Sequence, residues 1–354
     1  MIFHSQYRHF FWLVVAAFSL VINLVTVNNL QAQDPQFSQY YAAPLYLNPG
    51  FAGINQKGRA GLNYRNQWPS LAANYETYSF YTDYFFEPKH SALGMIVNTD
   101  KVGTSGYTST NLGLLYAYQL RLTQDWTFRP GVEVDYYWRD INFSSLTFPD
   151  QFNNSGLVNP TTQEPLSGLH ARFFDMSFGG VLHNDKMWLG ASLHHVLEPN
   201  QSVAGGNSPL PRKFSLHGGY KIHFSEISPR AQRSQKGRER SLTPTFNYKQ
   251  QGAYKQLDIG AYVTLQPIFF GVWYRGLPVN GFKGATNNEA IVSMVGFNAK
   301  SLTVGYSFDY TISNLTIGSG GAHEVSLIYT FSFDDPRKPS REVRELRCPV
   351  PFIF

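Results

Sequence analysis

The chain has 354 residues, which is enough for two ordinary domains or for one large barrel. It contains 22 Tyr, 28 Phe and 30 Gly, and only 15% of its residues are charged, a composition that favours short twisted strands over helices. The net charge of +5 is modest and most basic residues are scattered, which argues against nucleic acid as a partner.

Residues 1–32 are predicted to be an export signal that is removed. A basic start precedes an apolar run from Phe10 to Val27, and Ala32 offers a cleavage site before Gln33. The run is about long enough to span a membrane, so an uncleaved anchor helix is the alternative. Asn23 interrupts the run and favours a cleaved signal.

The next segment, residues 33–57, is aromatic but lacks the alternation of a strand. Its Asn48-Pro49-Gly50 sequence is a turn signal, because proline restricts φ and glycine tolerates a positive φ. Three placements are open for this segment. It lies inside a barrel as a plug, it covers the periplasmic mouth, or it simply leads into the first strand.

Strict alternation of apolar and polar residues begins after residue 58. Between residues 126 and 138 every second residue is apolar or proline, while Arg129, Glu133 and Asp135 lie between them. Successive side chains of a strand point to opposite faces, so this pattern predicts one apolar and one charged face. It recurs at a length of about ten residues, with aromatic residues towards the strand ends, which is typical of a membrane-spanning β-barrel. We predict an all-β, antiparallel barrel over residues 58–333 with about fourteen strands: 58–68, 75–86, 90–100, 108–122, 126–141, 173–183, 187–197, 212–224, 242–250, 254–266, 268–277, 289–298, 302–313 and 322–333.

The connections between these strands alternate in length. Short turns are expected at 87–89, 123–125, 184–186, 266–267 and 298–300, and longer polar loops at 69–74, 101–107, 142–172, 198–211, 278–288 and 314–321. Outer-membrane barrels have short periplasmic turns and longer outer loops, so both chain termini are predicted to be periplasmic. Strand edges must be paired in a membrane, and the sheet is therefore expected to close.

One connection breaks the alternation, because residues 225–241 are long where a short turn is expected. The basic residues of this segment are Arg230, Arg233, Lys236, Arg238 and Arg240. It is interpreted either as a solvated, disordered loop or as a docking surface for an acidic periplasmic partner or lipid headgroups.

Residues 334–354 follow the last strand and are predicted to be a periplasmic tail. The tail contains the one cysteine of the chain, Cys348, which excludes an internal disulfide. We expect an inert or solvent-facing thiol, with metal binding or intermolecular pairing as the alternatives.

Serine and histidine share a strand face at Ser192 and His194, and again on the next strand, where a hydrolase could be imagined. The residues of that next face are Ser215, His217, Lys221 and His223. Nucleophilic catalysis needs a base and a third group that orients it, and this spacing is weak evidence because alternating polar residues arise in any barrel lumen. We therefore expect no enzymatic activity, no cofactor and no metal site. The lumen residues mix both signs of charge, which favours a filled interior, although solvation by channel water explains them equally.

Two motifs at the start of the mature chain identify a family. The first motif is Gln33, Asp34, Pro35, Phe37, Ser38, Gln39 and Tyr40, and the second is Asn48, Pro49 and Gly53, followed by Arg65 and Trp68 on the first strand. The chain resembles the PorP/SprF-like outer-membrane proteins of the type IX secretion and gliding systems of Bacteroidetes. Further similarity is found around Asp258 and Arg275, and at Cys348-Pro349 near the C-terminus.

The resemblance implies a non-enzymatic outer-membrane component that helps secrete, retain or anchor a surface protein. The partners that it implies are outer-membrane lipid, a secreted protein with a type IX sorting domain, and a periplasmic peptidoglycan-binding protein of the same system. A passive channel for small solutes is the alternative, because the same strands would serve it equally well.

Overall fold

The computed structural model describes residues 34–72, 74–103, 106–142, 146–153, 156–157, 161–163, 170–203, 205–224, 239–277, 287–299, 301–313, 317–332 and 348–350. Within these ranges no helix has the length and apolar character needed to cross a membrane. The predicted signal and the greater part of the basic connection lie outside them.

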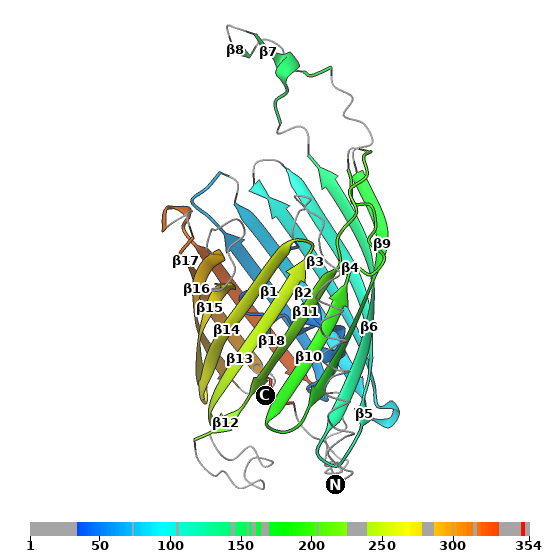
Figure 1. Ribbon diagram of the computed structural model, residues 1–354, viewed down its shortest axis with the longest axis vertical. Helices are drawn as coiled ribbons and strands as arrows, with labels where there is room; N and C mark the ends of the chain where they lie inside the picture. The colour runs from blue at the N-terminus through cyan, green and yellow to red at the C-terminus, as the bar shows by residue number, and fades with distance from the viewer. Residues whose placement is uncertain are drawn as a thin grey trace, which may run out of the picture.

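The chain forms a closed antiparallel β-barrel (Figure 1). Each strand pairs with the next along the chain, and the last strand returns to the first, with Gly58 opposite Phe331 and Gln67 opposite Ala322. Two short strands continue their predecessors after single irregular residues, so the wall has 14 strands. The predicted fold is confirmed.

The wall strands are β1 (Gly58–Gln67), β2 (Tyr75–Phe86), β3 (Ser91–Val102), β4 (Tyr107–Tyr118) continued by β5 (Leu120–Arg121), β6 (Thr127–Ile141), β9 (His170–His183), β10 (Met187–His194), β11 (Lys213–Tyr220) continued by β12 (Ile222–His223), β13 (Arg240–Gln251), β14 (Tyr254–Leu265), β15 (Ile268–Leu277), β16 (Asn287–Ala299), β17 (Leu302–Thr311) and β18 (Ala322–Phe331). Short helical turns are α2 (Pro44–Leu47), η1 (Pro49–Phe51), η2 (Glu87–Lys89), η5 (Pro149–Gln151) and η7 (Ile317–Ser319).

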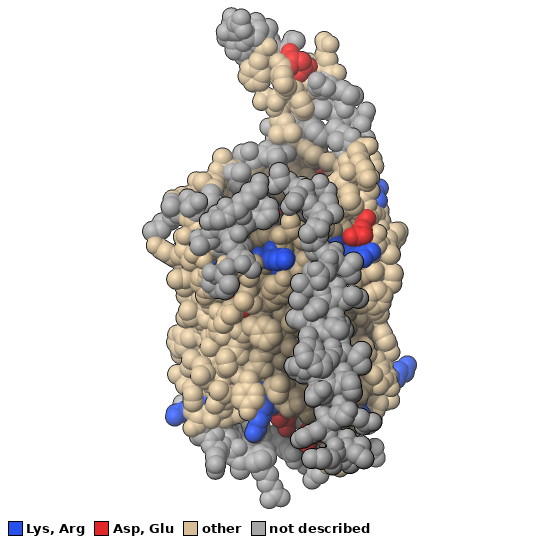
Figure 2. Space-filling model, in the orientation of Figure 1, with Lys and Arg blue, Asp and Glu red and all other residues tan. Residues whose placement is uncertain are grey.

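Alternation along the strands separates an apolar outside from a polar inside. On β6, Val134 is 44% exposed, whereas its neighbours Glu133 and Asp135 are buried in the lumen. Leu114 and Phe174 also point outward, as the hydrocarbon of a membrane requires. On the face shown in Figure 2, Lys, Arg, Asp and Glu gather towards the two ends of the barrel, and other residues form the band between them.

The two ends of the barrel differ in their connections. We call the end with the short turns, at the bottom of Figure 1, the turn end, and the opposite end the loop end. From the loop end an arm projects beyond the barrel, with η5 and a small hairpin of β7 (Phe152–Asn153) and β8 (Gly156–Leu157). The arm is the longest of the loops predicted for this end.

Some strand ends differ from the prediction for local reasons. β10 stops at His194 rather than at residue 197, because His195 has a φ of 59°, which is incompatible with an extended strand. β3 begins at Ser91 because His90 closes η2 in the left-handed region, with a φ of 49°. Alternation marks the centre of a strand, and these backbone angles set its ends.

Candidate functional site

The barrel interior is filled by the chain's own N-terminal segment, residues 34–57, drawn in blue in Figure 1. Tyr41 and Leu45 have no exposed surface. The segment forms only the helical turns α2 and η1, and it pairs with no strand of the wall. Its position therefore depends on side-chain contacts.

A buried ionic cluster binds the segment at Ser38. We call Ser38, Arg65 of β1, Arg275 of β15, Asp309 of β17 and Glu324 of β18 the Ser38 cluster. Arg65 donates to Ser38 Oγ at 2.6 Å and to Asp309 Oδ2 at 2.9 Å, and Arg275 donates to the same two oxygens at 2.8 Å each. The N–H of Ser38 donates to Glu324 Oε2 at 2.7 Å. Two guanidinium groups thus neutralise two carboxylates that could not remain charged alone in the interior.

The next residue, Gln39, is held by the same part of the wall. Its N–H donates to Glu324 Oε1 at 3.1 Å, and its side-chain amide donates to Ser307 Oγ at 3.2 Å. The amide oxygen accepts a bond of 2.6 Å from Ser326 Oγ. Gln39 has no exposed surface, so an apolar replacement would leave these wall groups without partners.

The predicted turn at Asn48 is seated against glycines of the wall. Asn48 Nδ2 donates to the carbonyl oxygens of Gly180 and Ala191 at 3.1 and 2.9 Å, and Asn48 Oδ1 accepts from the N–H of Gly50 at 2.8 Å. A Cβ atom on Gly179 would lie 2.2 Å from Asn48 Oδ1. Glycine at that position is what allows the turn to approach β9 so closely.

A second ion pair fixes the end of the segment that leads into β1. Arg59 donates to both oxygens of Asp83, with Nε at 2.9 Å and Nη2 at 2.8 Å, and both side chains are buried. Asp83 also accepts from the N–H of Gly53 at 2.6 Å, and Gly53 has a φ of 64° that favours glycine. Arg129 donates to the carbonyl oxygen of Ala52 at 2.6 Å.

The opposite end of the segment is bound by Asp34, His195, Asp175 and Lys213, which we call the Asp34 cluster. His195 Nε2 lies 2.7 Å from Asp34 Oδ2, and His195 Nδ1 lies 2.6 Å from Asp175 Oδ2. Lys213 Nζ donates to Asp34 Oδ2 at 2.8 Å. His195 follows the end of β10 and Lys213 begins β11, so the cluster lies at the loop end of the barrel.

Charges within the Asp34 cluster stabilise each other. Burial acts to raise the pKa of Asp34, but the charges of His195 and Lys213 outweigh it and hold that pKa well below its ordinary value. Burial acts to lower the pKa of His195, and Asp34 and Asp175 raise it to about 9. His195 follows β10 and carries a positive charge at neutral pH.

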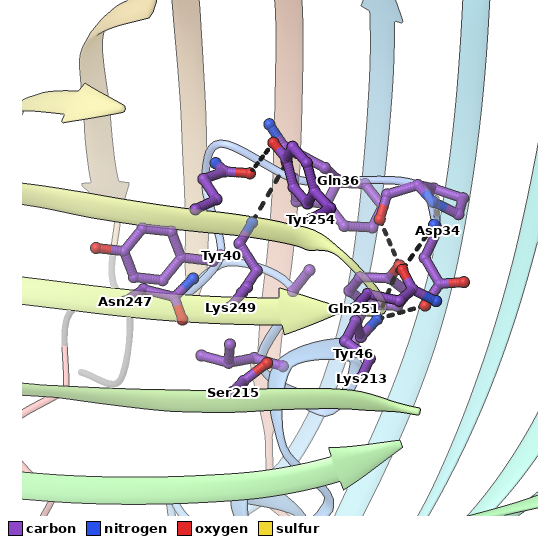
Figure 3. Close-up of a pocket in the computed structure, with 15 residues that line it drawn as sticks. Asp34, Gln36, Tyr40, Tyr46, Lys213, Ser215, Asn247, Lys249, Gln251 and Tyr254 are labelled. Carbon is purple, nitrogen blue, oxygen red and sulfur yellow. Dashed lines mark hydrogen bonds and ion pairs between the residues drawn. The ribbon is translucent and has the colours of Figure 1, made fainter. Parts of the chain in front are cut away.

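Two cavities flank the first residues of the segment. The first, shown in Figure 3, has a volume of about 50 Å³ and lies against β11, β13 and β14, where it is lined by Tyr40, Lys213 and Lys249. The second has a volume of about 40 Å³ and lies against β3, β4 and β6. A water molecule needs roughly 10–15 Å³ of such volume, so each cavity has room for a few waters.

The structure brings most residues of the predicted family motifs into the lumen. Those in the interior are Asp34, Pro35, Phe37, Ser38, Gln39, Tyr40, Asn48, Pro49, Gly53 and Arg65. Trp68 lies apart at the loop end. Its backbone N–H donates to the carbonyl oxygen of Gly321 at 2.7 Å, and its ring contacts Tyr75. Gln33 lies outside the described residues.

Of the five basic residues of the connection, one lies within the described residues. Arg240 is exposed at the start of β13, at the turn end. The other four residues, Arg230, Arg233, Lys236 and Arg238, lie outside the described ranges, so their docking role stays a prediction.

Three of the serine and histidine residues considered for catalysis, Ser192, His194 and His217, contact the N-terminal segment. Ser192 Oγ donates to the carbonyl oxygen of Leu47 at 2.8 Å, and His194 Nε2 lies 3.3 Å from the same oxygen. His217 Nε2 lies 3.2 Å from Asn48 Nδ2. These side chains therefore help to hold the segment.

Sequence reasoning did not single out Arg59, Asp83 or His195. Arg59 and Asp83 had a usable signal, because each is a charged residue at an inward position of an alternating strand. His195 had none, since it lies beyond the alternating part of its strand.

Of the two expectations for Cys348, an inert or a solvent-facing thiol, the solvent-facing one is wrong. Cys348 is 3% exposed and belongs, with Val350 and Tyr41, to the hydrophobic cluster of the interior. Burial raises the pKa of its thiol to about 12, which keeps the thiol protonated and unreactive. Residues 348–350 therefore return to the interior, and the rest of the predicted tail lies outside the described residues.

These features define an outer-membrane β-barrel whose lumen is filled by its own N-terminal segment. Residues 29–329 match the family described as "Type IX secretion system membrane protein PorP/SprF", and the chain belongs to this family. It is therefore an outer-membrane component of a type IX secretion system.

Similarity to other known proteins is low. Among solved structures, a mutant Rh. blastica porin shares 9% identity with a TM-score of 0.33, over 78% of this chain and 99% of the porin. A triple mutant of Rhodopseudomonas blastica porin shares 8% identity with a TM-score of 0.33, over the same shares of the two chains. This likeness is too weak to support an inference. No curated protein matches the chain significantly.

Proposed function

We propose that this protein is a closed, non-catalytic barrel that helps secrete, retain or anchor a surface protein in type IX secretion and gliding. The observation that carries the proposal is the filled lumen, in which the Ser38 cluster holds the N-terminal segment across the interior. A diffusion channel needs a continuous water path, whereas buried side chains of the segment, among them Tyr41 and Leu45, occupy the interior where that path would run. The passive-channel alternative is therefore disfavoured.

A closed barrel acts through the surfaces at its two ends. We assign the loop end to the cell exterior, where the arm with β7 and β8 projects towards a secreted protein with a type IX sorting domain. We assign the turn end to the periplasm, although Asp34, the first described residue, lies at the loop end. The basic connection 225–241 begins and ends there, and it would contact the peptidoglycan-binding protein of the same system.

The non-catalytic role is supported by the contacts of the lumen. The Ser192 hydroxyl and the His194 ring, which a hydrolase would need free, both contact the Leu47 carbonyl oxygen. They are partners of the N-terminal segment in a filled interior.

Gene deletion combined with pull-down tests the proposed role. We expect the deletion strain to lose a surface protein while uptake of small solutes is unchanged. Expression of the full-length protein should restore that surface protein.

A variant without residues 231–239 should lose its periplasmic partner in a detergent pull-down read by mass spectrometry. A deletion of equal length in the arm, 154–162, is the matched control and should keep that partner. Normal surface proteins in the deletion strain would contradict the proposal.

Planar-bilayer conductance tests the closed lumen separately. The mature protein should pass no steady current, and a variant without residues 34–53 should conduct. Large steady currents from the intact protein would overturn the proposal in favour of the passive channel.

A further inference from the structure

Two carboxylates of β6 converge inside the barrel. Glu133 and Asp135, which we call the carboxylate pair, are 4% and 3% exposed. Glu133 Oε1 and Asp135 Oδ1 each lie 2.6 Å from the point that a Cβ atom on Gly113 would occupy. Two charged carboxylates cannot share a buried place without a neutralising charge, because both desolvation and mutual repulsion oppose it.

Arg139, His195 and Lys213 line the same cavity as the carboxylate pair, and each contacts other groups. Lys213 and His195 are engaged by Asp34 at 2.8 and 2.7 Å. Arg139 donates to Gln201, and its guanidinium lies over the rings of Tyr137 and Phe173. In the described part of the chain, no Lys, Arg or His forms a salt bridge with either member of the pair. The wall therefore provides no direct ion-pair partner for either carboxylate, and a bound proton or a bound cation must neutralise the pair.

An amide oxygen beside the pair also has no partner. Asn98 is 5% exposed, and its Nδ2 donates to Asn111 Oδ1 at 3.1 Å, while Asn111 Nδ2 donates to Asp135 Oδ1 at 2.9 Å. Asn98 Oδ1 is buried without a hydrogen bond. Asn98 and the carboxylate pair line the second cavity together. A buried oxygen without a hydrogen-bond donor repels two nearby carboxylates. A positive charge between these oxygens would remove that repulsion.

We propose that the second cavity binds a hydrated divalent cation of the calcium class, with Glu133, Asp135 and the Asn98 carbonyl oxygen as its protein ligands. Carboxylate and amide oxygens are the ligands that such hard cations prefer. Calcium takes six to eight oxygens in flexible geometry, and the cavity of about 40 Å³ has room for a few waters that complete the shell. The cation would balance the carboxylate pair and satisfy the orphaned oxygen at the same time.

The cation would also strengthen the hold on the N-terminal segment. Asp34, Pro35 and Tyr46 of the segment line the same cavity, opposite the carboxylate pair. Repulsion between the pair and Asp34 falls when the pair is neutralised. The inference is independent of the proposed function, since a passive barrel could bind the same ion.

Terbium luminescence and thermal unfolding test the site in the full mature protein. The protein, purified in detergent and freed of metal with EDTA, should give saturable Tb³⁺ emission sensitised by Tyr137, which lines the cavity. Excess CaCl2 should displace the emission and raise the unfolding temperature by about 3 °C or more, relative to NaCl of equal ionic strength. The Tyr137→Phe variant should lose part of the emission, since Tyr46 also lines the cavity, and should keep the calcium-dependent rise.

Two variants remove the site by different means. The double variant Glu133→Gln with Asp135→Asn removes its charge, and Gly113→Ala places a methyl group between the two oxygens. Both should lose the calcium response. The double variant should be at least as stable as the wild type without calcium, which separates loss of the ion from misfolding.

Asp125→Asn, an exposed acid at the turn end, is the matched control and should respond normally. An absent calcium response in the wild type, or a full response in the double variant, would show that the pair is neutralised by a shared proton instead.

Discussion

Single ion pairs decide how firmly the N-terminal segment is held. The guanidinium of Arg59 and the carboxylate of Asp83 have 2% and 0% exposed side-chain surface. Removal of one charge from such a pair leaves the other buried and uncompensated. The loss in the free energy of unfolding is far larger than the stabilisation that an exposed ion pair contributes.

For this reason Asp83→Asn should destabilise the barrel by about 3–5 kcal/mol. The loss is measured by denaturant unfolding in detergent, followed by tryptophan fluorescence. Glu198→Gln breaks the exposed pair between Glu198 and Arg212, whose side chains are 45% and 55% exposed, and should cost about 0–1 kcal/mol. Equal losses in the two variants would contradict the role given to burial.

The Asp34 cluster should make stability depend on pH. The pKa of His195 is raised to about 9, above the ordinary value of about 6.5. Its contribution is fully present below about pH 6.5 and is lost as the pH rises through about 9. The pKa of Asp34 is lowered, so its contribution is present above its ordinary value and is lost as the pH falls below that value.

We therefore expect the unfolding temperature to fall between pH 7 and about pH 9.5, and to fall less in His195→Gln. His170→Gln changes an exposed histidine at the start of β9 and serves as the control, with the slope of the wild type. The same slope in His195→Gln and the wild type would show that His195 does not couple to the segment.

At the scale of elements, the turn at Asn48 depends on close contact with β9. A methyl group at Gly179 would collide with Asn48 Oδ1, since the two atoms would lie 2.2 Å apart. We expect Gly179→Ala to displace the turn and to produce current steps in planar bilayers. In Gly206→Ala the added Cβ atom would lie 3.6 Å from its nearest neighbour, so this variant should produce no current steps, like the wild type. Absence of current steps in the Gly179→Ala variant would mean that the segment does not need this contact to close the lumen.

β10 has the least extensive pairing in the wall. It pairs with β9 only over Trp188–Leu193, whereas β13 pairs with β14 over its whole length, Arg240–Gln251. Local opening is easier where fewer backbone hydrogen bonds must break together. Hydrogen exchange followed by mass spectrometry should show faster exchange in Met187–His194 than in β13. Slower exchange in β10 would indicate that the N-terminal segment, which contacts Ser192 and His194, stabilises this strand from inside.

At the scale of the whole molecule, the barrel combines an apolar exterior with an ionic interior. Such a barrel resists detergent until it is heated, because the first and last strands pair and the closed wall has no open edge. Unheated protein should therefore migrate differently from boiled protein on gels. Identical migration, together with solubility in the absence of surfactant, would contradict the fold.

Much of this architecture could be predicted from local sequence. Alternation placed Glu133 and Asp135 on the lumen face and Val134 on the outer face, and the structure agrees. The family motifs pointed to Ser38, Gln39 and Asn48 without indicating their partners. Three of the partners of Ser38, which are Arg275, Asp309 and Glu324, lie more than 230 residues further along the chain.

The amino-acid order thus specifies strands, their two faces and the closed class of fold, because a period of two is a local property of the backbone. The contacts of the lumen depend instead on register and closure. Gly58 must meet Phe331 before Arg65, Asp309 and Glu324 can surround Ser38, and before Cys348 finds an apolar place inside. A shift of one residue in register would turn each of those wall side chains towards the lipid, and no local pattern carries that information.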